Sequence, residues 1–154
     1  MQDFQSLVVK DKDQVFLFAC PGNMPFIFAK HPWFVINRHG LITRWEVLFR
    51  KRAGTTSWGH IHKNFLAPWN GLGILPYFER YFPYRSKILG FCEGEVAQRM
   101  ADQIENSPNT YPYQSNFSLA GPNSNTYAQW ILDNSTETML KLPWNSFGKN
   151  YRRN

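Results

Sequence analysis

The residues best suited to chemistry lie together in the segment Gly121-Pro122-Asn123-Ser124-Asn125-Thr126. Gly-Pro sets a sharp turn, and Asn or Ser side chains accept the free amides at the start of a helix. An apolar stretch with helical spacing follows, so a helix is expected over about residues 125–132. The N-terminus of a helix also favours nucleophiles and anions. Ser124 is therefore a candidate nucleophile, and Asn123 and Asn125 are candidate ligand-binding residues.

A predicted hairpin supplies the second group of candidates. Residues 25–36 and 41–49 are rich in β-branched and aromatic side chains, and a turn over residues 37–40 separates them. Pairing of the two ends of this turn would place His31 opposite Glu46 on one strand face. The other face is almost wholly apolar and is expected to be the core. A histidine beside a carboxylate can act as a general base, so chemistry is expected on the first face.

Ser124, His31 and Glu46 have the residue types that nucleophilic catalysis requires. The imidazole would take the serine proton, the carboxylate would orient the imidazole, and helix amides would hold the oxyanion. In an alternative interpretation, Asn123 or Ser124 only caps the helix. In another, a cleft binds a peptide, glycan or acyl ligand without catalysis, and exposed aromatic residues such as Trp33, Trp58 and Trp69 line it.

Two histidines raise a third alternative, a metal-binding protein. His60 and His62 would share one face of a strand and could bind Zn²⁺ or another divalent ion. A third ligand is required, and no acid or cysteine lies at the usual local spacing. Solvated histidines at a strand edge are the simpler interpretation, so neither a metal nor a cofactor is predicted. Cys20 and Cys92 form no CxxC pair and are expected to be reduced and buried.

The order of the expected elements indicates an α+β protein. Residues 95–105 carry Val96, Met100 and Ile104 at four-residue steps, which predicts a helix that ends at Asn106-Ser107-Pro108. Strand-like runs precede both helices, so a small antiparallel sheet packed against two or three helices is expected. The 154 residues are most simply one domain over 1–154, with 1–13 and 133–154 as peripheral segments.

Charge and hydropathy narrow the range of partners. The net charge of +6 resides partly in short basic runs at residues 50–52 and 152–153, which lie on no groove-reading element and do not favour nucleic-acid binding. No stretch reaches the roughly 18 apolar residues of a membrane helix. The chain is expected to be cytoplasmic, or periplasmic if a leader has been removed. A small molecule or peptide is the predicted ligand, and the oligomeric state is left open.

Four motifs resemble the bacterial domain-of-unknown-function family 3750, and they occur in one order over roughly residues 15–151. They are Phe28-Ala29-Lys30-His31-Pro32-Trp33-Phe34-Val35-Ile36, Tyr111-Pro112-Tyr113, the hexapeptide at 121–126 and Gly148-Lys149-Asn150-Tyr151. This resemblance implies no established activity.

A looser similarity links the chain to circularly permuted NlpC-like hydrolases of the papain-like group. These enzymes place a histidine on an early strand and an Asn-Cys pair at a later helix start. The similarity implies a hydrolase or acyltransferase relative acting on amide or ester bonds, with His31 at the histidine position and Ser124 at the cysteine position. Serine departs from that pattern and implies either a serine-based enzyme or a degenerate site.

Overall fold

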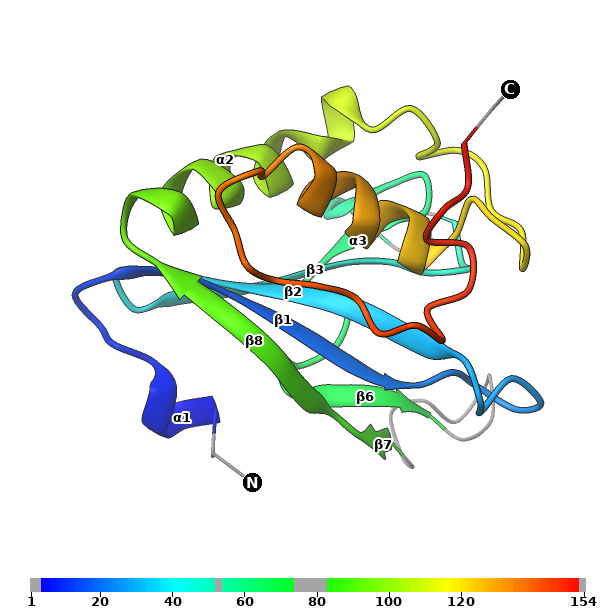
Figure 1. Cartoon of the computed structure of the whole chain (residues 1–154), viewed down its shortest axis with the longest axis horizontal. Coiled ribbons are helices and arrows are strands. Elements are labelled where there is room, and N and C mark those ends of the chain that lie inside the picture. The colour runs from blue at the N-terminus through cyan, green and yellow to red at the C-terminus, as the bar shows by residue number, and fades with distance from the viewer. Residues whose placement is uncertain (1–3, 52–53, 74–82, 153–154) are drawn as a thin grey trace.

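The computed structural model shows a six-stranded sheet whose strand pairs all run antiparallel (Figure 1). The structure describes residues 4–51, 54–73 and 83–152, so Arg52 and Arg153 of the basic runs lie outside the described residues. In sheet order the strands are β4 (Ser57–Trp58), β5 (Ile61–Lys63), β3 (Leu41–Val47), β2 (Lys30–Arg38), β1 (Asp13–Pro21) and β8 (Lys87–Glu93). A separate pair joins β6 (Asn70–Gly73) to β7 (Pro83–Arg85).

Among the described residues, three helices accompany the sheet, which makes the fold α+β as predicted. They are α1 (Phe4–Leu7), α2 (Glu95–Thr110) and α3 (Ser124–Asp133). Figure 1 shows α2 and α3 on one side of the sheet, and α1 and β6 on the other. Within the described ranges, no helix combines the length and the hydropathy that crossing a bilayer requires.

Both faces of the sheet are buried. On the face under α2 and α3, side chains such as Phe34, Ile36 and Trp45 form the first core. On the opposite face, Trp33 and Val35 form a second core with residues of β1, α1 and β6. The alternating pattern predicts a core on one face only. The structure differs because α1 and the β6–β7 pair cover the face that carries His31.

The β2–β3 hairpin differs from the predicted register by two residues. Arg38 pairs with Leu41, which leaves His39 and Gly40 as a two-residue turn with φ of 49° and 92°. Positive φ at both central residues suits the twist of a tight hairpin. A shift of two residues preserves the face of every side chain. His31 and Glu46 consequently share a face, as the pattern predicts, but are diagonal neighbours instead of opposed partners.

Two other elements differ from the sequence prediction. α2 continues through Pro108 to Thr110, because the Ser107 hydroxyl bonds to the Tyr127 hydroxyl of α3 at 2.9 Å and fixes the last turn. β2 begins at Lys30 instead of residue 25, because residues 22–29 close into a hydrogen-bonded loop. The segment after α3, residues 134–152, has no helix or strand.

Candidate functional site

The segment Gly121–Thr126 forms the predicted turn and helix start. The side-chain oxygen of Asn123 accepts the amides of Asn125 at 2.9 Å and Thr126 at 3.2 Å. The Thr126 hydroxyl in return accepts the Asn123 amide at 3.1 Å, which completes a capping box. Asn123 is therefore the N-cap of α3, and Ser124 is its first helical residue.

The same side chains fasten the C-terminal segment to the helix. The side-chain amides of Asn123 and Asn125 both donate to the carbonyl of Phe147, at 3.2 and 2.9 Å. The Thr126 hydroxyl donates to the carbonyl of Gly148 at 2.7 Å. We refer to Asn123, Asn125 and Thr126 as the tether. The two asparagines predicted to bind a ligand thus bind the chain's own backbone.

The tether and the C-terminal segment pack so closely that glycine is required at positions 121 and 148. Gly148 has φ of 87°, and a Cβ there would lie 2.4 Å from the side-chain nitrogen of Asn123. Gly121 has φ of 114°, and a Cβ there would lie 2.7 Å from the Cβ of Tyr151. Both conformations favour glycine, and neither site has room for a methyl group. The motif at 121–126 and the Gly-Lys-Asn-Tyr motif therefore form one structural unit.

His31 and Glu46 meet on the opposite face of the sheet, as predicted. His31 Nε2 lies 2.9 Å from Glu46 Oε2, and Arg44 Nη2 donates to the same oxygen at 2.7 Å. The Arg44 guanidinium also lies over the Trp33 ring, 4.1 Å from its centroid. The Trp33 indole N–H donates to the carbonyl of Pro68 at 2.8 Å. Trp33, predicted to be an exposed ligand contact, is instead fully buried in this cluster.

The charges in this cluster are tightly coupled. The side chains of Arg44 and Glu46 are both 0% exposed. Burial alone would raise the pKa of Glu46, but the Arg44 charge and the His31 hydrogen bond outweigh it and lower that pKa to about 2. The carboxylate is therefore ionised at neutral pH and holds both basic side chains in place.

Ser124 follows the N-cap of α3, and its neighbour Asn125 donates a side-chain N–H to the Lys30 carbonyl, next to His31, at 2.9 Å. α3 packs on the first core, where the Tyr127 ring contacts Phe34 at 6.4 Å between centroids. The His31 ring instead stacks on Trp33 at 5.9 Å, on the other side of the sheet. Within the described ranges, no hydrogen bond joins Ser124 to His31 or Glu46. The structure thus unites two of the three residues predicted for catalysis and leaves the serine buried at the helix start.

The imidazoles of His60 and His62 are both hydrogen-bonded to backbone carbonyls. His60 Nδ1 bonds the Leu48 carbonyl at 2.8 Å, and His62 Nε2 bonds the Arg50 carbonyl at 2.7 Å. Burial lowers the pKa of His62, which favours the neutral imidazole. Both histidines are buried instead of solvated at an edge, because β5 lies between β3 and β4. In the part of the chain that the structure describes, no three potential ligands gather around them to hold a metal.

The cysteines show no sign of a reactive site. Burial raises the pKa of the Cys20 thiol to about 11, and it raises the pKa of Cys92 as well. Both thiols are free, and Cys20 donates to the carbonyl of Pro21 at 3.1 Å. The expectation that the two cysteines are reduced agrees with this geometry, although Cys92 is only half-buried.

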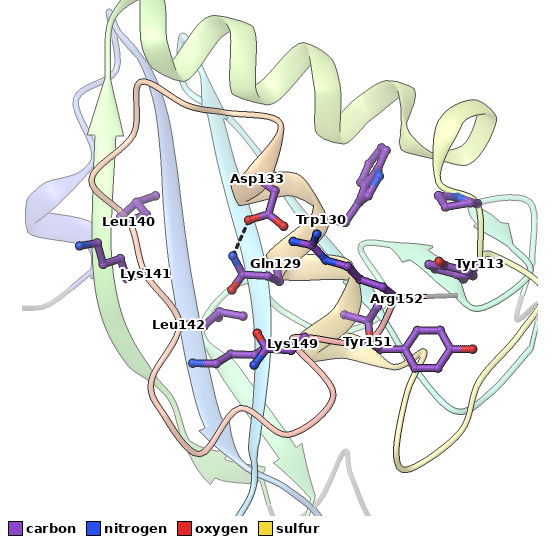
Figure 2. Close-up of a pocket in the computed structure, with 13 residues that line it drawn as sticks. Tyr113, Gln129, Trp130, Asp133, Leu140, Lys141, Leu142, Lys149, Tyr151 and Arg152 are labelled. Atoms are coloured by element: carbon purple, nitrogen blue, oxygen red, sulfur yellow. Dashed lines mark hydrogen bonds between the residues drawn. The ribbon is translucent and has the colours of Figure 1, made fainter. Parts of the chain in front are cut away.

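A groove between α3 and the C-terminal segment brings together side chains that the sequence analysis does not group into one site (Figure 2). Its volume is about 500 Å³. Three aromatic residues line it, Tyr113, Trp130 and Tyr151, together with three basic residues, Lys141, Lys149 and Arg152. The tether places one wall of the groove, because it fixes the carbonyls at 147 and 148 immediately before the lining residues 149–152.

The groove is electropositive. Asp133 is the one carboxylate in its lining and accepts a hydrogen bond from Gln129 at 2.8 Å. In Figure 2 Gln129 and Asp133 on α3 and Arg152 on the C-terminal segment project into the same space. Two signals in the sequence mark this site: residues 126, 129, 130 and 133 recur at helical spacing on one face, and residues 138–154 contain bases but no acid.

The fold and its candidate site define an α+β protein in which a capped helix holds an irregular C-terminal segment around an electropositive, aromatic groove. The family described as "Protein of unknown function (DUF3750)" matches residues 13–151, and the chain belongs to this family. No curated protein and no solved structure matches the chain. The resemblance to the papain-like group consequently stays a prediction.

Proposed function

We propose that the protein is a binding protein whose groove takes an anionic peptide or glycan. The observation that carries this proposal is the lining itself, with three basic and three aromatic side chains around about 500 Å³. Aromatic rings accept the planar or apolar parts of such ligands, and Lys and Arg pair with carboxylates. A few polar groups in a concave, partly apolar site are typical of ligand recognition.

The lining favours these ligands over an acyl chain. An acyl chain needs an unbroken apolar wall, whereas Thr126, Gln129 and Asp133 interrupt the groove along α3. A hydrolase acting on amide or ester bonds has less support. Its general base would have to reach Ser124, whereas the His31 imidazole bonds to Glu46 and stacks on Trp33.

Isothermal titration with matched probes tests the proposal. The anionic probes are acetyl-Glu-Tyr and glucuronate, and the neutral controls are acetyl-Gln-Tyr-amide and glucose. The proposal predicts that at least one anionic probe binds more tightly than its neutral counterpart, by roughly tenfold for each added ion pair. Monolaurin, which has an acyl chain but no carboxylate, tests the acyl alternative and should not bind.

Two substitutions assign the binding to the groove. Lys141→Gln and Arg152→Gln each remove one exposed positive charge from the lining. Each should weaken binding of the anionic probe, whereas Lys10→Gln, an exposed lysine far along the chain, should leave it unchanged. Equal affinity for charged and neutral probes, or equal effects of all three substitutions, would overturn the proposal.

A further inference from the structure

A second surface, outside the groove, carries exposed apolar side chains from two distant segments. We refer to its six residues as the apolar tip. They come from the β1–β2 loop and the C-terminal segment: Met24, Phe26, Ile27, Phe28, Trp144 and Phe147. Trp144 is 84% exposed and Phe28 is 61% exposed. Figure 1 shows the β1–β2 loop projecting beyond the end of the sheet.

Direct contacts join the two segments into one surface. The Phe28 ring meets the Phe26 ring at 6.2 Å and the Phe147 ring at 5.9 Å, both edge to face. The Asn145 side chain donates to the Phe28 carbonyl at 2.9 Å. The tip is therefore a contiguous apolar patch, which is a feature of interaction sites more than of an ordinary surface.

Three backbone amides of the loop are hydrogen-bonded within the loop itself. The amide of Gly22 donates to the Ala29 carbonyl at 3.0 Å, and the amide of Phe26 donates to the Asn23 carbonyl at 2.7 Å. The amide of Ala29 donates to the Phe26 carbonyl at 3.0 Å. A loop whose backbone is hydrogen-bonded internally loses little when its tip leaves water for an apolar medium.

The two chain segments that form the tip carry charged side chains of one sign only. Residues 14–45 and 138–154 contain no Asp or Glu, whereas Lys30 follows the loop directly and Lys149 lies beside Trp144 and Phe147 in a second hollow. Aromatic side chains with neighbouring lysines are the residue types that favour the boundary between lipid headgroups and acyl chains. A symmetric pair of tips from two copies would instead bring like charges together.

We propose that the apolar tip docks the protein peripherally onto a membrane surface that contains anionic lipids. Phe26, Ile27 and Phe28 would enter the interfacial layer with Trp144, and Lys30 would pair with lipid phosphates. This docking does not depend on the groove ligand. It would orient the C-terminal side of the molecule, which carries the groove, close to the membrane.

Vesicle sedimentation tests the proposal with the full chain. The protein should sediment with vesicles of phosphatidylcholine and phosphatidylglycerol, and much less with vesicles of phosphatidylcholine alone. Ile27→Ser and Phe28→Ser should each lower the protein's apparent affinity for the anionic vesicles about tenfold, since each removes a large apolar contact. Added salt should weaken binding of the wild type.

The control lies at the other end of β2. Leu41, next to the β2–β3 turn, is 68% exposed, so Leu41→Ser removes a comparable apolar side chain away from the tip and should leave sedimentation unchanged. Failure to bind the anionic vesicles, or equal binding by all three variants, would overturn the proposal. The proposal would also be overturned if the protein did not bind vesicles but self-associated, and if Phe28→Ser abolished that self-association. The tip would then be a contact between copies of the chain.

Discussion

At the scale of single residues, Glu46 has the largest electrostatic role in the described part of the chain. One of its oxygens accepts both His31 and Arg44, and neither Arg44 nor Glu46 contacts water. Removing one partner from such a group leaves a buried charge uncompensated, which costs more than the pair contributes when intact. The His31–Glu46 pair, which the sequence suggests for catalysis, is better explained as part of this buried structural network.

The Glu46→Gln substitution tests that interpretation. It should lower the free energy of unfolding by about 3–5 kcal/mol, because the Arg44 charge stays buried without its counter-charge. Glu93→Gln is the matched control, since Glu93 pairs with Lys12 at 2.8 Å on the exposed surface and should cost under about 1 kcal/mol. Urea unfolding followed by fluorescence measures both. Equal costs would contradict the structural role.

The pH dependence of stability provides a second test at this scale. The folded-state pKa of Glu46, about 2, lies below the ordinary value of 4.5. Its contribution is therefore complete above about pH 4.5 and is lost as the pH falls toward 2, by on the order of 3 kcal/mol. The unfolding free energy of the wild type should fall across this window, and that of Glu46→Gln should fall less. Parallel curves would contradict the assignment.

At the scale of elements, the tether explains why positions 123, 125 and 126 of the hexapeptide carry polar side chains. Asn123 caps α3, and the tether side chains reach the backbone of the segment at 147–148. Asn125 also reaches the Lys30 carbonyl at the start of β2. Three segments distant in sequence therefore meet at the first turn of one helix.

The Asn123→Ala substitution tests the tether. It removes the N-cap, worth about 1 kcal/mol, and also the bond to the Phe147 carbonyl, so a loss of about 2 kcal/mol is expected. Hydrogen exchange should rise at the amides of Lys149 and Tyr151, which bond within the C-terminal segment. Asn109→Ala, at an exposed bond within α2, should change neither quantity appreciably. Unchanged exchange in the C-terminal segment would mean that it holds its position without Asn123.

The helices and strands show which features of the fold can be predicted from sequence patterns. The residue types around 124–132 and 95–105 identify both long helices, and period-two alternation identifies the faces of β2 and β3. The hairpin register does not follow from alternation, because a shift of two residues leaves every face the same. The residue pattern of β8 does not predict a strand, because none of its residues is fully buried and its conformation depends on pairing with β1 at the edge of the sheet.

At the scale of the whole molecule, the sequence does not predict on which face of the sheet α3 packs. The sequence identifies Ser124 at a helix start and His31 beside Glu46. It does not reveal that a second core covers the His31 face while α3 packs on the other. The groove cannot be predicted from the sequence either, because Tyr113, Trp130 and Arg152 come from a loop, a helix and the C-terminal segment. Only the folded chain places them around one space.

The measurement that tests the central claim most directly is an NMR titration of the protein with acetyl-Glu-Tyr, followed at the tryptophan indole N–H signals. Trp130 lines the groove, whereas the Trp33 indole is buried and bonded to the Pro68 carbonyl. The account predicts that the Trp130 signal shifts in a saturable way while the Trp33 signal stays in place, and that Lys141→Gln weakens the response. Saturable binding that moves Trp33 and leaves Trp130 unchanged would contradict it.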